Sequence, residues 1–234
     1  MTGIPHGRPN TKKGGRAYRD NNNDDGSSFA MSSKRVESKF KINRRLGVNL
    51  WGRAKSPLNR RDYGPGQHGQ RRKKPSDFGT QLMAKQKLKG YYGNISERQF
   101  RRLFTEARRR KGDTAENLIG LLERRLDAVV YRMKFAVSPF ASRQLVNHGH
   151  ITVNGRKVNI PSFQVKQGDV LAVKDRTVKN PHVDSAWSTA VGRGRPAWLS
   201  SYGRDMSVTV SSTPKREDID ANINEQLIVE LYSK

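Results

Sequence analysis

Hydrophobic residues recur at helical spacing in two adjacent stretches near the middle of the chain. In the first, Ser96 and Gln99 form a capping box, and apolar positions follow at i, i+3, i+4 and i+7: Phe100, Leu103, Phe104 and Ala107. In the second, Asp113 with Glu116 opens a helix whose apolar stripe is long: Leu118, Leu121, Leu122, Leu126, Val129, Val130 and Met133. The pattern predicts one helix over 96–111 and one over 113–133, each with a buried stripe.

The pattern then changes to a helix followed by a hairpin. Ser138 and Pro139 are typical of a helix start, and Gly149 is typical of a left-handed helix end. One face between them carries Ala141, Leu145 and His148. Asn154-Gly155 is a strong signal for a two-residue turn, with alternating apolar positions on both sides: Ile151, Val153, Val158 and Ile160.

Alternation returns after the hairpin and predicts strands over 170–173 and 207–211. Residues 175–205 have no such period, so we expect a loop there, anchored by Trp198 and Leu199. Asn222 with Glu225 is expected to cap a last helix with an apolar face: Ile223, Leu227, Ile228 and Leu231. That face must pack against another part of the protein.

The composition adds a strong charge to this pattern. Of 234 residues, 46 are basic and 21 acidic, which gives a net charge of +25, and only 33% are hydrophobic. Such self-repulsion is relieved when a polyanion binds, so nucleic acid or an anionic membrane is the natural partner. The chain has no cysteine, which excludes disulfides and thiolate metal sites. Its apolar runs are too short to cross a membrane, and no hydrophobic signal segment follows Met1.

Residues 34–74 carry clusters of basic residues between glycines, prolines and aromatic residues. Gly64, Gly66 and Gly69 match the G-x-G-x-x-G fingerprint of dinucleotide sites, but no apolar strand precedes them and no amphipathic helix follows. We therefore reject that match and expect the loop to bring backbone N–H groups close to phosphate. The preceding residues 1–31 have almost nothing to bury, and we expect a disordered extension there.

Several motifs together resemble a known family. The run RQLVNHGHITVNGRKVNIPSFQVKQGD resembles the S-four RNA-binding domain, also called the alpha-L motif. The segments NRRDYGPGQHGQRRKK, AKQKLKGYYGNISERQFRRLF and INEQLIVELYS resemble the ribosomal S-four family of the small subunit, in the family's order. The family often has a basic residue where this chain has Pro139, so that contact cannot be carried over.

The resemblance implies an α+β fold, with a mostly helical N-terminal domain and an inserted alpha-L domain of two helices and a small β-hairpin or sheet. The C-terminal segment is implied to pack back on the N-terminal domain. We expect four parts: an extension (1–31), the N-terminal rRNA-binding domain (32–123), the alpha-L domain (124–187) and the C-terminal segment (188–234).

Side chains that can donate to phosphates and 2′-hydroxyls are the candidate RNA-binding residues. In the N-terminal domain they are Arg44, Arg45, Arg60, Arg61, Tyr63, Gln67, His68, Arg71, Arg72, Lys85, Lys87, Lys89, Tyr91 and Tyr92. In the alpha-L domain they are Arg124, Arg143, Gln144, Asn147, His148, His150, Asn154, Arg156 and Lys157. Arg124, Arg125 and Arg132 could face either RNA or solvent.

The function implied is that of a structural constituent of the small ribosomal subunit, which binds its rRNA early in assembly and contributes to translational accuracy. Implied partners are small-subunit rRNA, neighbouring proteins resembling S-five and mRNA at the entry channel, in the cytoplasm of a bacterium or in an organelle. No membrane partner and no cofactor is expected. His148 and His150 lack an evident third metal ligand, and the cysteine cluster of zinc-binding members is missing.

Two other classes of protein are compatible with parts of the pattern. Alpha-L domains also occur in RNA-modifying enzymes, but such an enzyme needs a separate catalytic domain, and only loops and a tail remain unassigned here. A generic basic protein that coats DNA or membranes would not need capped helices, an Asn-Gly hairpin or glycine loops. We therefore predict a non-enzymatic RNA-binding protein with a defined surface.

Overall fold

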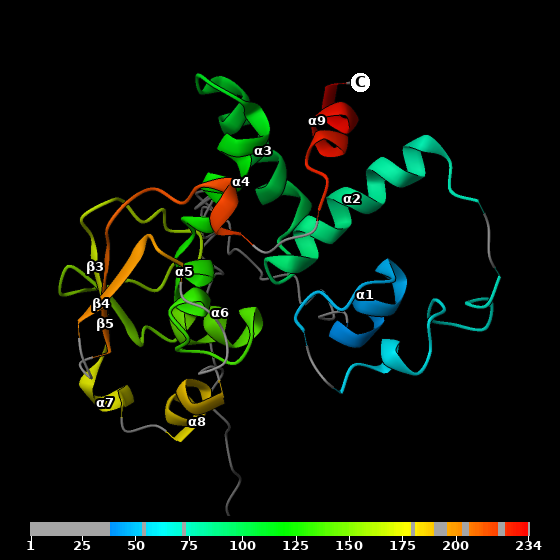
Figure 1. Ribbon diagram of the computed structural model, residues 1–234. Helices are drawn as coiled ribbons and strands as arrows, with labels where there is room; N and C mark the ends of the chain where they lie inside the picture. Colours follow the sequence, from blue (N-terminus) through cyan, green and yellow to red (C-terminus); the bar gives the residue numbers. More distant parts are fainter. Residues whose placement is uncertain are drawn as a thin grey trace, which may run out of the picture. The chain divides into compact units, whose positions relative to one another are not determined.

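The computed structural model describes residues 38–52, 55–71, 74–178, 181–189, 196–202, 206–219 and 223–233 (Figure 1). These residues belong to one compact unit that spans Glu37–Lys234. Arg72, Asn222 and the expected extension 1–31 lie outside the described residues. The fold combines helices with one antiparallel sheet, which confirms the predicted α+β class.

The described residues between 38 and 123 are mostly helical. Their elements are α1 (Lys39–Leu46), the 3-10 helix η1 (Pro57–Asn59), α2 (Asp77–Tyr91), α3 (Glu97–Arg109) and α4 (Thr114–Glu123). Ser96 Oγ accepts from Gln99 N and Asp113 Oδ2 accepts from Glu116 N, so the two predicted helix starts are confirmed. Each such cap contributes about 1 kcal/mol to stability. Helix α1 has only 8 residues, and α2 has a weak apolar face. The hydrophobic pattern of the sequence therefore predicts neither helix.

The prediction of a single helix over 113–133 is wrong. Helix α4 ends at Glu123, and a separate helix, α5 (Leu126–Arg132), begins after a break of two residues. At the break, Arg124 O accepts from Val165 N, and Leu126 N donates to Phe163 O. Arg125 forms an isolated antiparallel bridge with Gln164. Backbone groups that would have continued one helix bind the segment before the third strand instead, a tertiary effect that helical spacing cannot reveal.

The second part builds a sheet on α5 and α6 (Pro139–Asn147). Its strands are β1 (Ile151–Val153), β2 (Arg156–Lys157), β3 (Val170–Val173), β4 (Leu199–Tyr202) and β5 (Ser207–Val210), in the antiparallel order β2-β1-β3-β5-β4. Ser138 Oγ caps α6 by accepting from Ala141 N, as predicted. The buried side of α6 is formed by Pro139, Ser142 and Val146 rather than by the expected face.

Residues 175–205 contain more structure than the expected loop. Within them lie α7 (Asp175–Val178), α8 (Pro181–Thr189) and β4. Trp198 and Leu199 are buried in the core beneath the sheet, as predicted. Among the side chains that the structure describes in α7 and α8, Thr177, Val183 and Ala186 are buried. These few buried positions leave little periodic signal in the sequence.

Two main hydrophobic cores divide the described residues. One joins α2, α3 and α4 with the end of the chain through Ile219, Ile223 and Ile228; the other lies between α5, α6 and the sheet. The expected C-terminal segment 188–234 is therefore split. Strands β4 and β5 extend the sheet, and only the later part, with η2 (Arg216–Asp218) and α9 (Gln226–Ser233), packs on the first core.

Candidate RNA interface

The turn between β1 and β2 is held by the side chain of Asn154. Asn154 and Gly155 have φ angles of 50° and 76°, the pair of positive values that a type I′ turn needs. Asn154 Nδ2 donates to Asp169 Oδ1 at 2.9 Å, and its Oδ1 accepts from Val170 N at 2.8 Å. The predicted hairpin is confirmed, and the exposed Asn154 already uses its amide within the protein.

Lys157 is aligned by a glycine at the end of α6. A Cβ placed on Gly149 would lie 2.1 Å from Lys157 Cε, so the lysine side chain runs across the bare backbone of this turn. Nearby, burial lowers the pKa of His150, and the charges of His148, Lys174 and Lys157 lower it further. Positive groups therefore converge where α6 ends and the hairpin begins, and an anion would relieve their repulsion.

Replacing Gly149 by alanine should displace Lys157 and weaken RNA binding. Gly155→Ala is a matched control, because Gly155 also has a positive φ but no atom lies within 4 Å of its Cβ position. Both variants carry a backbone cost of about 1–2 kcal/mol. Only Gly149→Ala should shift the Lys157 side-chain resonances and reduce RNA affinity beyond the control in a titration. Equal affinities would show that the position of Lys157 is irrelevant to binding.

The glycine loop closes on itself. Gly64 N donates to Gly69 O at 3.2 Å, and Gly69 N donates to Gly66 O at 3.1 Å. A Cβ on Gly69 would lie 2.0 Å from Gly64 O, so only glycine fits there. The expectation that these N–H groups approach phosphate is therefore wrong for Gly64 and Gly69, whose donors bind carbonyls of the loop. Gln67 and His68 remain exposed at its tip.

Arg44 supports this loop from α1. Its Nε donates to Tyr63 O at 3.1 Å and its Nη2 to Gly64 O at 2.9 Å. Its guanidinium carbon also lies 5.0 Å from the centre of the Tyr63 ring. Arg44 and Tyr63 thus shape the loop, while the neighbouring Arg45 is exposed.

Two predicted lysines of α2 are committed to a carboxylate. Lys85 and Lys89 bind the two oxygens of Glu97 at 2.9 Å and 2.7 Å, and Tyr232 O–H donates to the same carboxylate. Burial raises the pKa of Glu97, but these three donors outweigh it and lower the pKa to about 2. Lys89 is buried, so its expected place on the RNA-facing surface is corrected.

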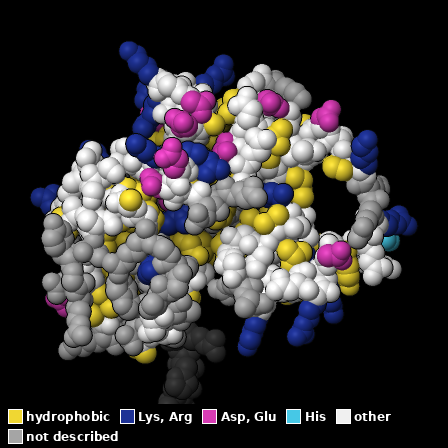
Figure 2. All heavy atoms as spheres, viewed as in Figure 1, with side chains coloured by type: hydrophobic (Ala, Val, Ile, Leu, Met, Phe, Trp, Pro, Cys, Tyr) yellow, Lys and Arg dark blue, Asp and Glu magenta, His cyan; other side chains and the backbone are white. Residues whose placement is uncertain are grey.

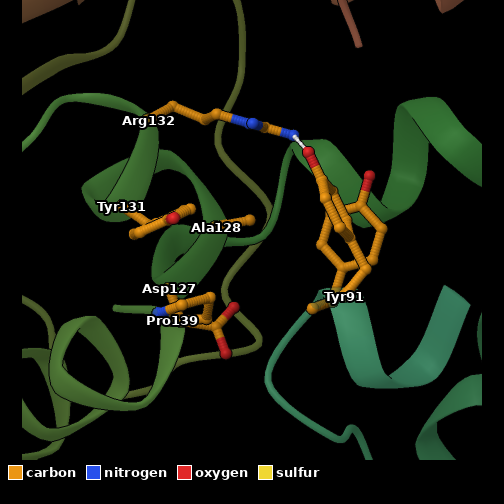
Figure 3. A pocket seen from close by; sticks show the side chains of 7 residues that line it. Tyr91, Asp127, Ala128, Tyr131, Arg132 and Pro139 are labelled. Carbon is orange, nitrogen blue, oxygen red and sulfur yellow. Dashed lines mark hydrogen bonds between the residues drawn. The ribbon is translucent and has the colours of Figure 1, made fainter. Parts of the chain in front are cut away.

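A second carboxylate, Glu123, joins α4, α5 and the end of α2. Its two oxygens accept from Arg132 Nε at 3.0 Å, from Arg132 Nη2 at 2.6 Å and from Tyr92 O–H at 2.7 Å. Arg132 Nη2 also donates to the hydroxyl oxygen of Tyr91, at 2.8 Å. Figure 3 shows this bond. Burial lowers the pKa of Arg132, but Glu123 more than offsets this effect and leaves the pKa well above its ordinary value. Tyr92 and Arg132 therefore act inside the protein.

Asp127 forms the third network and holds α6 against the end of α2. Arg125 binds both Asp127 oxygens, at 3.0 Å and 2.9 Å, and Arg143 Nε binds Oδ2 at 3.0 Å. The remaining Arg143 nitrogens donate to Gly93 O at 2.8 Å and Tyr92 O at 2.9 Å. Arg125 is buried, so it faces neither RNA nor solvent. We call this arrangement the Asp127 clasp.

The predicted residues thus divide by exposure. Those exposed are Arg45, Arg60, Arg61, Gln67, His68, Arg71, Gln144, Asn147, His148, Asn154, Arg156 and Lys157. Half-buried are Arg44, Tyr63, Lys85, Lys87, Tyr91, Arg124, Arg143 and His150, whereas Lys89 and Tyr92 are buried. The exposed members lie in three places: the end of α1 with the loop after η1, the outer face of α6, and the hairpin.

Sequence reasoning missed the two carboxylates that organise the interior. Glu123 and Asp127 are 0% and 3% exposed, and both lie in the stretch 118–130, where Arg124 and Arg125 are the other charged residues. Charged residues of both signs at core positions are the available signal, because buried charges occur in pairs. The sequence could not show that Arg132 and Arg143 are the partners.

Charge on the visible face is not uniform. Figure 2 shows Lys and Arg side chains around α1 and around α3, with Asp and Glu side chains near η2. Among the described residues, no helix is long and apolar enough to span a bilayer. Over the same residues, no group of three His, Cys, Asp or Glu could hold a metal ion.

The fold and its basic surface define an RNA-binding protein that presents a capped helix and a tight hairpin. The family model described as "Ribosomal protein S4/S9 N-terminal domain" matches residues 34–123, and the model described as "S4 domain" matches residues 124–171. The chain is 64% identical over 205 residues to "Small ribosomal subunit protein uS4" of Gluconobacter oxydans and 63% identical over 205 residues to that of Granulibacter bethesdensis. Each match covers 86% of this chain and 100% of the relative. The chain belongs to the uS4 family of small ribosomal subunit proteins.

Proposed function

We propose that this protein is a structural, non-enzymatic constituent of the bacterial small ribosomal subunit and binds its rRNA. The observation that carries the proposal is the convergence of exposed donors on two rigid elements. Gln144 and Asn147 are exposed on α6 and His148 is exposed at its C-terminal end, and Arg156 and Lys157 are exposed on the hairpin that follows. Fixed donors at short spacing suit the phosphates and 2′-hydroxyls of folded RNA, whose major-groove base edges are inaccessible.

A second group of exposed donors supports the same function. Arg45, Arg60, Arg61 and Arg71 stand around the closed glycine loop, with Gln67 and His68 at its tip. The carboxylate networks at Glu123 and Asp127 bind the end of α2 to α5 and α6. We propose that residues 32–123 form one RNA-binding part and that α5, α6 and the sheet form another.

The protein should bind naked small-subunit rRNA without other ribosomal proteins, because its exposed donors lie on the glycine loop, α6 and the hairpin, which all belong to this chain. Purified protein and rRNA can be tested by filter binding, with the same rRNA bearing a disrupted binding region as the control. Footprinting then locates the contact. Specific binding that appears only after other ribosomal proteins are added would contradict the role of a primary binder.

Neighbouring proteins and mRNA are finer parts of the proposal. We propose contacts with an S-five-like neighbour and with mRNA at the entry channel, together with a contribution to translational accuracy. These rest on the family alone. Substitutions of exposed residues such as Ser185 and Ser188 on α8 can be scored for misreading. If only variants that also block assembly alter decoding, accuracy is no separate function of this protein.

A further inference from the structure

A basic cleft lies on the side of α4 that faces the C-terminal segment. Its volume is about 410 Å³, and it is lined by the end of α3, by α4 and by residues 213–217. Its charged side chains are Arg110, Glu116, Arg124, Lys215, Arg216 and Glu217. Figure 2 shows Lys and Arg side chains gathered beside acidic ones near η2, the segment that packs on α4.

Two arginines of the cleft, Arg124 and Arg216, have guanidinium nitrogens that bind oxygen atoms of the protein. Arg216 Nε lies 2.9 Å from Glu225 Oε1, and its Nη1 donates to Ile219 O. Arg124 Nε donates to the uncharged Val165 carbonyl at 2.9 Å, rather than to a carboxylate. This hydrogen bond from Nε orients the Arg124 guanidinium and does not use its two terminal nitrogens.

The cleft concentrates positive charge. Arg110, Arg124, Lys215 and Arg216 line it, against the carboxylates Glu116 and Glu217. Burial lowers the pKa of Arg124, the charge of Arg110 lowers it further, and Asp169 opposes these effects only in part. Arg110 itself binds Glu106 from outside the cleft, at 3.2 Å. Two guanidinium groups that repel each other across a half-buried space are stabilised when an anion lies between them.

We propose that this cleft binds a backbone phosphate of RNA, with Arg110, Arg124 and Lys215 as its donors. The planar fork of arginine suits two phosphate oxygens at once, and the volume accommodates a phosphodiester with its sugars. The inference rests on the proposed rRNA-binding function and adds a contact point on α4 that is separate from the α6–hairpin surface. An acidic surface of a neighbouring protein is the competing occupant.

A phosphate at this point would also act on the break between α4 and α5. Arg124 ties that break to Val165 through its side chain and its carbonyl. The next residue, Arg125, belongs to the Asp127 clasp. A phosphate bound by Arg124 would therefore lie next to Arg125, in the segment that connects the helices of the first core with those of the second.

The test uses the full chain and spares Arg124, because that residue supports the fold. Arg110→Ala with Lys215→Ala removes two proposed donors from the cleft. Arg109→Ala with Lys111→Ala is the control, since Arg109 lies beside Arg110, its side chain is 79% exposed and neither residue lines the cleft. Circular dichroism confirms folding. Affinity for small-subunit rRNA is then measured at several salt concentrations.

The cleft variant should lose about 0.7–0.9 of the salt slope for each phosphate contact removed, and the control should keep the parent slope. Equal slopes for all three proteins, with specific binding by the parent, would overturn the cleft proposal alone. Absence of specific rRNA binding by the parent would overturn the proposed function itself. A cleft variant that binds rRNA like the parent but fails to enter assembled subunits would assign the cleft to a protein partner and also overturn the proposal.

Discussion

Replacing Glu123 by alanine should lower the free energy of unfolding by about 3–5 kcal/mol. Glu123 is fully buried, and it accepts three hydrogen bonds from Arg132 and Tyr92. The Arg132 side chain is only 16% exposed, so its charge would lose its carboxylate without reaching bulk water. Removing one member of a buried ion pair is costly because the other charge stays desolvated.

Urea denaturation of the parent and the variant measures this loss. Glu106→Ala is the control, because that surface carboxylate also contacts two arginines, Arg109 and Arg110, yet remains in water. Its removal should barely change stability, since solvent screens exposed pairs. The double variant Glu123→Leu with Arg132→Met should recover much of the loss by leaving no buried charge. A Glu123→Ala variant as stable as Glu106→Ala would mean that the network is hydrated.

Local signals in the sequence predicted local structure. The caps at Ser96, Asp113 and Ser138 and the Asn154-Gly155 turn are each determined by a few neighbouring residues, and all of them are confirmed. The apolar stripe of α3 was equally clear, because each of its positions contacts the same core.

Structure that depends on distant residues could not be predicted in this way. The break at Arg124 arises from hydrogen bonds to residues near Val165, about forty positions later. Strand β4 has its partner in β5, and the buried residues among the described side chains of α8 are Val183 and Ala186, so neither element shows a strong hydrophobic period of its own. These elements are fixed by pairing across the fold rather than by their own sequence.

The same limit applies to the candidate site. Composition predicts a basic surface, but it does not distinguish an arginine that faces solvent from one that binds a buried carboxylate. Arg156 is exposed, whereas Arg143 is directed by Asp127 and two backbone carbonyls. The sequence makes both candidate RNA-binding residues, because the hairpin directly follows the helix. Their contacts give them different expected roles.

Arg143→Ala should therefore destabilise the protein and leave the salt dependence of RNA binding unchanged. The substitution removes three hydrogen bonds, one of them to the carboxylate of Asp127, which is 3% exposed. A hydrogen bond to a charged group contributes about 1.5–3 kcal/mol, which sets the expected loss of stability. RNA affinity should fall at every salt concentration by a similar factor, because α6 is less firmly held against the end of α2.

Arg156→Ala with Lys157→Ala should show the opposite result, because both side chains are exposed and β2 lies at the edge of the sheet. Its stability should stay close to that of the parent, while the slope of log affinity against log salt should fall by about 1.4–1.8 for two lost phosphate contacts. Thermal unfolding and titrations at several salt concentrations measure both quantities for each variant.

If Arg143→Ala instead keeps the parent stability and reduces the slope by about 0.7–0.9, Arg143 binds phosphate directly and the Asp127 clasp opens on RNA. If the hairpin variant retains the full parent slope, the RNA is held at another part of the basic surface.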